Sequence, residues 1–325
     1  MMTTATEMGT NITRAAALLR QGEVVGIPTE TVYGLAGNAL NREAVAAIFA
    51  VKNRPSFDPL IIHVGSPALI EQWTLGLPEA LQALANAFMP GPLTLLLNKQ
   101  PAIPDLVTAG LPRVAIRVPD HPLTLALLAE LDFPLAAPSA NPFGYISPTS
   151  AQHVVNQLNG RIPYVLDGGS CSVGLESTIV GLEEGRPTIF RKGGLAVETI
   201  EALIGPVAVR EHSTSNPQAP GMLKSHYAPR MPLVLADPAQ LPDSLPPHRV
   251  GVLAFREAAP WAPAQNQQIL SPDGNLQQAA SRLFAALRYL DELDIDLIVA
   301  ELVPERDLGR AINDRLRRAA AEPLQ

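Results

Sequence analysis

The chain has 325 residues, 47% of them hydrophobic and 17% charged, which suits two unequal folded domains and excludes disorder as the default state. A formal net charge of -7 argues against a protein whose main role is to bind a nucleic-acid phosphate backbone. An aromatic content of 5% argues against one that binds single strands by stacking bases on aromatic side chains. The single cysteine, Cys171, excludes an internal disulfide and a thiolate-rich zinc site. Because no apolar run reaches membrane-span length and residues 1–11 lack a signal-peptide layout, we expect a cytoplasmic protein.

Helix-like and strand-like segments alternate over the first two hundred residues. Asn11 is a predicted helix cap before an Ala/Leu-rich stretch that ends at Gly22, and Asn41 opens a second helix. The alternation predicts an α/β fold, and the many short, proline-flanked strands favour a mixed sheet. The predicted strands are Glu23–Ile27, Leu60–Val64, Leu93–Leu97, Val114–Val118 and Leu135–Ala137, and two further helices are predicted at Pro122–Leu131 and Ser150–Leu158.

The amino-acid composition and the hydrophobic pattern change near Arg210. Residues 210–231 are rich in Ser, Pro, Asn and Gln and lack apolar periodicity, which predicts an extended linker between a domain at 1–209 and a smaller α/β domain at 232–325. The smaller domain is predicted from strands at Leu233–Leu235, Val250–Phe255 and Leu297–Ala300 and helices at Leu276–Leu293 and Asp307–Ala320. We interpret Arg315, Arg317 and Arg318 on the last helix as a solvated face, with contact to tRNA or a partner as the alternative.

Standard catalytic and binding motifs are missing from the sequence. There is no Gly-Lys pair for a Walker-type loop, no G-x-G-x-x-G after a strand, no H-E-x-x-H and no G-x-S-x-G. An enzyme with this sequence must therefore build its site from several loops.

Two polar clusters lie in the first third of the chain. Pro28–Gly34 follows a strand with hydroxyls and a carboxylate, which fits either a small polar ligand or a Thr-rich turn. Lys52 and Arg54 could clamp a phosphate, although favourable charge at a helix C-terminus is the commoner reason for such a pair. His63 ends an apolar run, where a buried core histidine is the alternative to a ligand contact.

Two more clusters follow. Arg117 lies in an apolar strand, so it requires either an anionic ligand or a buried carboxylate. Arg113 precedes it, and the Ser/Asn loop at 137–141 follows. The glycine-rich stretches 174–178 and 191–194 could present N–H groups to phosphate or form a hairpin with exposed charges. Together the four clusters suggest a pocket for a nucleotide and a small amino-acid-like ligand.

At these residues the sequence closely resembles the threonylcarbamoyl-AMP synthase family, which shares the YrdC-like domain. The resemblance implies a YrdC-like twisted mixed sheet with a central cleft, followed by a Rossmann-like α/β domain as in the longer branch of the family. The matching blocks are PTETVYGLAGNA (28–39), KNRPSFDPLIIH (52–63), PGPLTLLL (90–97), VAIRVPDHP (114–122), APSANPFGYISPT (137–149), VLDGG (165–169), GLESTIV (174–180), IFRKGG (189–194) and PGMLKSHYAP (220–229).

The resemblance implies a reaction that joins L-threonine, bicarbonate and ATP into threonylcarbamoyl-adenylate with release of pyrophosphate. A downstream tRNA threonylcarbamoyl-transferase complex would use the product, and direct binding of tRNA to this chain stays open. Mg²⁺ carried with ATP is the expected cofactor, without a metal site made by the protein. Positioning, rather than a covalent intermediate, would drive the reaction.

Site residues follow from the resemblance motif by motif. Threonine is expected at Thr31, His63, Arg117, Ala137 and Ser177. ATP is expected at Lys52, Arg54, Asp58, Arg113, Ser139, Ser147, Arg191 and Tyr227, the last as part of a lid, with Lys52 and Arg54 positioning the phosphates. The alternatives are a non-catalytic RNA-binding module, which the acidic balance disfavours, and a hydrogenase-maturation carbamoyltransferase, whose acylphosphatase and zinc-finger modules are missing.

Overall fold

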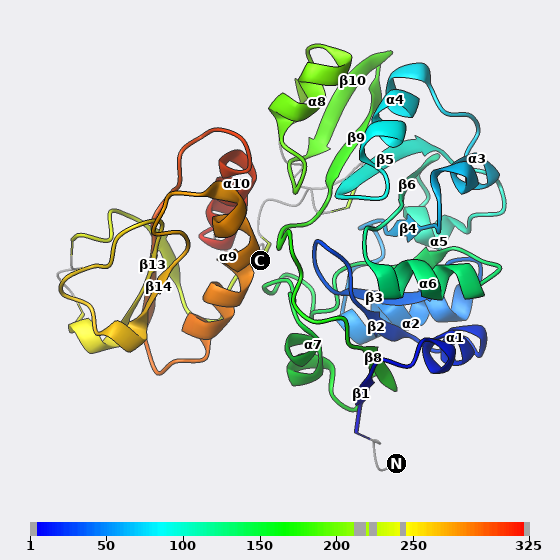
Figure 1. Ribbon diagram of the computed structural model, residues 1–325. Helices are drawn as coiled ribbons and strands as arrows, with labels where there is room; N and C mark the ends of the chain where they lie inside the picture. The colour runs from blue at the N-terminus through cyan, green and yellow to red at the C-terminus, as the bar shows by residue number, and fades with distance from the viewer. Residues whose placement is uncertain (1–4, 211–218, 221–225, 241–244, 322–325) are drawn as a thin grey trace.

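The computed structural model describes residues 5–210, 219–220, 226–240 and 245–321. It has two sheets, one in each half of the chain (Figure 1). The large sheet has the order β1-β8-β2-β3-β7-β4-β6-β5-β9-β10-β11 and mixes parallel with antiparallel pairs, which confirms the predicted mixed sheet. The small sheet, β12-β15-β13-β14, is parallel throughout. Most of the predicted linker lies outside the described residues, and the exact domain boundaries stay a prediction.

The elements of the first half surround the large sheet. Its strands are β1 (Glu7–Gly9), β2 (Val25–Ile27), β3 (Gly34–Asn38), β4 (Ile61–His63), β5 (Leu93–Asn98), β6 (Arg113–Arg117), β7 (Leu135–Ala136), β8 (Tyr164–Leu166), β9 (Thr178–Glu183), β10 (Arg186–Arg191) and β11 (Ala208–Val209). Its helices are α1 (Ile12–Arg20), α2 (Arg42–Lys52), α3 (Ile70–Trp73), α4 (Glu79–Phe88), α5 (Asp105–Thr108), α6 (Pro122–Glu130), α7 (Ala151–Leu158) and α8 (Val197–Ile204).

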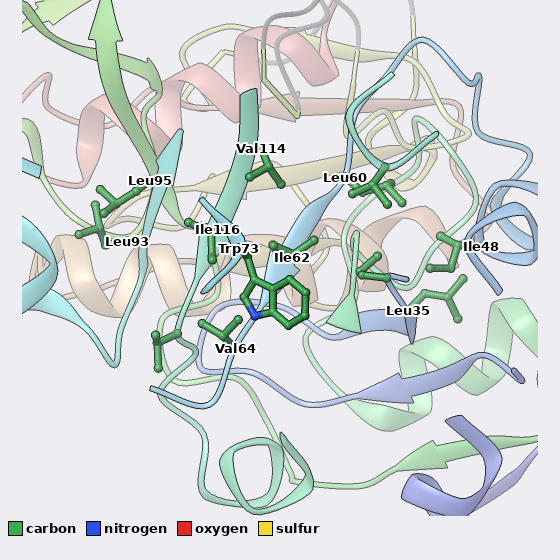
Figure 2. Packing of buried hydrophobic residues seen from close by; sticks show 14 of the residues in the cluster. Leu35, Ile48, Leu60, Ile62, Val64, Trp73, Leu93, Leu95, Val114 and Ile116 are labelled. Atoms are coloured by element: carbon green, nitrogen blue, oxygen red, sulfur yellow. The ribbon is translucent and has the colours of Figure 1, made fainter. Parts of the chain in front are cut away.

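Local signals in the sequence place the helices. Asn11 and Asn41 are the N-caps of α1 and α2, and the side chain of Asn41 accepts hydrogen bonds from the first-turn amides of its helix, as predicted. The apolar faces of the elements pack into one core (Figure 2), in which Trp73 lies with Ile62 and Val64 of the β4 region and with Ile116 of β6. Each such buried side chain stabilises the fold by about 1.5–3 kcal/mol.

The second half forms a smaller layered unit, also as predicted. Its strands are β12 (Leu233–Leu235), β13 (Val250–Ala254), β14 (Gln267–Ile269) and β15 (Leu297–Ala300), and its helices are α9 (Leu276–Asp291) and α10 (Gly309–Ala319). Both helices lie on the side of their sheet that faces the first half (Figure 1). Leu283 and Leu316 share a buried cluster with Ile146 and Leu175 of the large domain, so the two halves form a packed interface.

Candidate functional site

One cavity in the large domain collects most of the predicted site residues. Arg54, Ser139, Arg191 and Tyr227 of the predicted ATP set line it together with the whole predicted threonine set, which is Thr31, His63, Arg117, Ala137 and Ser177. The free space is only about 50 Å³, enough for a few water molecules. Because pockets for small ligands usually exceed about 300 Å³, the cavity is nearly closed in this conformation.

Arg117 is the charged centre of the part of the cavity that holds the predicted threonine set. It ends β6 beside His63, its register partner at the end of the parallel strand β4. The Arg117 guanidinium lies 2.6 Å from Glu30 Oε1 and donates to Thr31 Oγ1 at 2.8 Å and to the Gly91 carbonyl at 3.2 Å. The buried carboxylate that the sequence offered as one alternative is therefore Glu30. Three of the five N–H groups of Arg117 meet acceptors within the described part of the chain, which leaves capacity for a ligand carboxylate.

Ser177 and Arg191 form the opposite wall, at the near ends of the antiparallel strands β9 and β10. Arg191 donates to the Ser177 carbonyl at 3.0 Å and to its hydroxyl at 3.1 Å, and the same hydroxyl lies 2.7 Å from Thr94 Oγ1. The glycine after Lys192 makes this approach possible, because a Cβ on Gly193 would lie 2.2 Å from the Glu176 carbonyl. Burial lowers the pKa of Arg191 to about 10. Arg191 is buried, so the exposed-charge alternative for this hairpin is wrong.

Arg54 contributes a third guanidinium. It donates to the carbonyls of Asp58 and Pro59, and its Nη2 lies 2.9 Å from Asp58 Oδ2. Asp58 is fully buried behind Arg54 and does not line the cavity. Burial raises the pKa of the Asp58 carboxyl, and the Arg54 charge opposes that rise. Asp58 is therefore connected to the cavity through its ion pair with Arg54.

Three other predicted ATP residues do not line this cavity. The Lys52 ammonium is buried and donates to the backbone carbonyls of Ser139 and Asn141. Ser147 donates to Glu176 Oε1 at 2.6 Å. Arg113 lies at the opposite end of β6 from Arg117 and donates to the Leu182 carbonyl. Their contacts with ATP stay predictions.

Sequence reasoning assigned no role to several residues that shape the cavity. Glu176 lines the cavity, and Glu30 does not line it but pairs with Arg117, which does. Both lie inside motifs that sequence reasoning singled out, but nothing in those motifs distinguishes such residues from turn residues. His226 lines the cavity beside Tyr227, with ring centroids 4.2 Å apart. Arg315, which was predicted to lie on a solvated face, is instead fully buried against Glu176, and Arg318 is buried as well. Only Arg317 of that trio is exposed.

His63 predicts a pH-dependent stability. Burial, reinforced by the Arg117 charge, lowers its pKa to about 3, whereas an unfolded histidine titrates near 6.5. Below pH 6.5 the unfolded chain therefore binds the extra proton, and the free energy of unfolding falls until it levels off below about pH 3. Between pH 7.5 and 5 this histidine accounts for a loss of about 2 kcal/mol. Urea unfolding of the parent and of His63→Gln measures the difference.

The matched control for this measurement is His248, which is exposed in the C-terminal domain. His248→Gln is expected to keep the parent's pH dependence, while His63→Gln is expected to reduce the loss between pH 7.5 and 5 by about 2 kcal/mol. Equal steepness for the parent and His63→Gln would contradict the prediction.

Across the described ranges, no group of three or more His, Cys, Asp or Glu side chains is arranged to hold a metal ion. Within the same ranges, the helices are all too short or too polar to cross a membrane.

Comparison with known proteins links this site to one family. Residues 17–193 match the family described as "Telomere recombination", and residues 195–321 match the family described as "Threonylcarbamoyl-AMP synthase, C-terminal domain". The Bacillus subtilis threonylcarbamoyl-AMP synthase is 44% identical over 97% of this chain and 95% of its own length. The Pyrococcus abyssi enzyme of that name is 40% identical over 94% and 93%.

A solved structure agrees with the sequence comparisons. The crystal structure of Pyrococcus abyssi Sua5 complexed with L-threonine superposes with a TM-score of 0.88 at 38% identity, covering 97% of this chain and 98% of that one. The predicted fold, a YrdC-like domain followed by a Rossmann-like domain, is confirmed. With both family matches and this similarity over nearly its full length, the chain belongs to the threonylcarbamoyl-AMP synthase family of enzymes.

Proposed function

We propose that the chain is a nucleotidyltransferase that converts L-threonine, bicarbonate and ATP into L-threonylcarbamoyladenylate and pyrophosphate. The observation that carries the proposal is the single cavity in which Arg117, Arg54 and Arg191 converge with hydroxyl side chains. An amino-acid carboxylate and a triphosphate are the anions that such separate guanidinium groups suit. The names of the two relatives, and the L-threonine bound in the Pyrococcus abyssi structure, support the same substrates.

The threonine end would be built around Arg117. Its unused N–H groups would bind the amino-acid carboxylate, with Thr31, Ser177 and the backbone at Ala137 as further polar contacts. His63 stays neutral over the physiological pH range because of its low pKa, so it would contact the ligand without adding a second positive charge.

The ATP end would use Arg54, Ser139 and Arg191 from the cavity wall. Ser147, Asp58, Lys52 and Arg113 belong to the same proposed set, and the first three contact residues that line the cavity. Tyr227, with its positive φ of 65°, lies over the cavity and would act as part of the lid. Closure would exclude the water that otherwise hydrolyses the mixed anhydride.

The reaction would proceed in two steps. First, the neutral threonine amine attacks the carbon of bicarbonate or of CO₂ derived from it, so that a C–N bond forms, water is released overall and a carbamate results. Next, a carbamate oxygen attacks the α-phosphorus of ATP, the bond from that phosphorus to the bridging oxygen breaks, and pyrophosphate leaves. Positioning and neutralisation of phosphate charge by Arg54 and Arg191 would supply the catalysis.

Mg²⁺ fits this site only as an ion carried by ATP. Two carboxylates lie beside the arginines that are proposed to bind the phosphates. Asp58 is already paired with Arg54 and Glu176 with Arg315, so these carboxylates do not form a cage of oxygen ligands for a protein-bound metal. The ion would neutralise part of the triphosphate charge. Arg54 and Arg191 would bind and orient the phosphates.

The product would serve a downstream tRNA threonylcarbamoyl-transferase complex. Because that step acts on tRNA, the proposal puts the reaction in the cytoplasm and requires no tRNA binding by this chain itself. The acidic net charge of the chain is compatible with a protein that does not bind tRNA itself.

Pyrophosphate release from labelled ATP tests the proposal. We expect release only when both L-threonine and bicarbonate are present, because neither half of the carbamate can be made without the other. Each substrate is omitted in turn, and D-threonine serves as the matched control. Turnover of ATP that is independent of threonine would refute the assignment.

A further inference from the structure

The last helix of the C-terminal domain reaches the wall of the cavity. Arg315 of α10 has a fully buried side chain, and its Nε donates to Glu176 Oε2 at 2.9 Å. Its Nη1 lies 2.6 Å from Asp314 Oδ2. The Arg315 and Arg318 guanidiniums also lie over the ring of Tyr227, at 5.1 and 4.7 Å from its centroid. Thus one helix of the small domain contacts both a wall residue and the lid residue of the large domain's cavity.

The two carboxylate oxygens of Glu176 accept hydrogen bonds from different domains. Oε1 accepts from Ser147 of the large domain at 2.6 Å, and Oε2 accepts from Arg315. Burial alone would raise the pKa of Glu176, but the charges of Arg315 and Arg191 and the Ser147 hydroxyl together lower it below its usual value. Glu176 is therefore a fixed negative charge in the wall beside the proposed phosphate site.

A buried carboxylate beside a triphosphate is unfavourable unless a cation compensates it. Arg191 is close enough to contribute, but in the proposed function it also faces the phosphates. Arg315 lies on the far side of Glu176, is not among the residues that line the cavity, and pairs with the carboxylate directly. The Arg315 charge is therefore shared between Glu176 and Asp314, and Asp314 has Arg318 as a second partner at 3.5 Å.

We infer that Arg315 is a positioning residue that neutralises and orients Glu176, so that the C-terminal domain forms part of the ATP site. The inference rests on the proposed function, because it assumes a polyanionic substrate in the cavity. Without Arg315 the Glu176 charge would repel the triphosphate and release the Ser147 hydroxyl from its fixed position. The small domain would then act on catalysis through charge and not only through packing.

A double-mutant cycle on the full chain tests this role. The variants are Arg315→Met, Glu176→Gln and the pair combined, and the readouts are KM for ATP, KM for threonine and kcat. We expect Arg315→Met to raise KM for ATP about tenfold, as for coupled charges in contact, and to change KM for threonine much less. The double variant is expected to return to the KM of Glu176→Gln, because the uncompensated charge is gone. If the change in KM for ATP in the double variant equalled the product of the two single-variant changes, the residues would act independently and the inference would be overturned.

A packing role makes different predictions from a charge role. Arg310 of the same helix pairs with Glu198 of α8 across the same interface, but this pair is more than one-third exposed and touches neither Glu176 nor Tyr227. Arg310→Met is therefore the matched control, with KM for ATP expected to be unchanged. A rise equal to that of Arg315→Met would mean that any damage to the interface suffices, which would overturn the inference.

Folding of the variants is checked by thermal unfolding. If Arg315→Met does not fold, the double variant still decides the question, since the inference requires it to be more stable than Arg315→Met alone. A double variant that is equally unstable or less stable would overturn it. Failure of the proposed function is distinguishable, because it would appear in the parent as absent threonine-dependent pyrophosphate release.

Discussion

Replacing Arg117 by alanine is expected to reduce the affinity for L-threonine about a hundredfold while leaving the affinity for ATP within about threefold. The loss follows from removing the guanidinium that, in the proposed function, binds the amino-acid carboxylate in two places. The same change leaves Glu30 buried without its partner, so the free energy of unfolding should fall by about 3–5 kcal/mol. Calorimetry with each ligand, together with urea unfolding, measures both effects.

The double variant Glu30→Gln/Arg117→Met separates the two roles of Arg117. It removes both buried charges together, so it should recover most of the lost stability but none of the threonine affinity. Equal loss of threonine and ATP affinity in Arg117→Ala would show that the residue does not bind the carboxylate.

Lys52→Met should destabilise the protein by about 2–4 kcal/mol, because two buried carbonyls lose their donor. Those carbonyls belong to Ser139 and Asn141, and Ser139 lines the cavity, so we also expect weaker ATP binding as the loop loses its anchor. Burial and the nearby Arg54 charge already lower the pKa of Lys52 well below its usual value. Urea unfolding and ATP calorimetry are the measurements.

Lys99 provides the matched control. Its ammonium donates to one carbonyl, that of Ile103, and pairs with the exposed Asp105 outside the cavity. Lys99→Met should lower the free energy of unfolding by about 1 kcal/mol or less and leave ATP binding unchanged. If Lys52→Met kept its stability and lost only ATP affinity, Lys52 would be a direct phosphate ligand, and its role as a loop anchor would be wrong.

Much of the fold was predictable because its signals are local. Asparagine caps at Asn11 and Asn41, and apolar runs such as Leu93–Leu97, require no knowledge of partners. By contrast, strands β1, β3, β8, β9, β10, β11 and β14 were not predicted. The few residues of β1 and β11, for example, form strands only because β8 and β10 lie beside them, and such pairing is a tertiary effect.

The motifs predicted that several of these residues lie together, but they did not predict their contacts. Arg117 and Arg191 do line one cavity, yet only the structure identifies Glu30 as the partner of Arg117. Arg315 could not have been assigned from sequence, because an arginine on a helix with few apolar residues has the pattern of a solvated face. Its burial depends on a carboxylate more than a hundred residues away, which no local pattern encodes.

The strand order of the large sheet has a consequence for synthesis of the chain. β1 and β2 emerge early, but both pair with β8, whose residues Tyr164–Leu166 are translated far later. At typical elongation rates that interval is on the order of ten seconds, during which β1 lacks its strand neighbour and β2 is paired on one edge only, with β3. Such non-local pairing slows folding, so we expect nascent chains that are stalled before β8 to be captured by chaperones or proteases, and chains stalled after β11 to resist them.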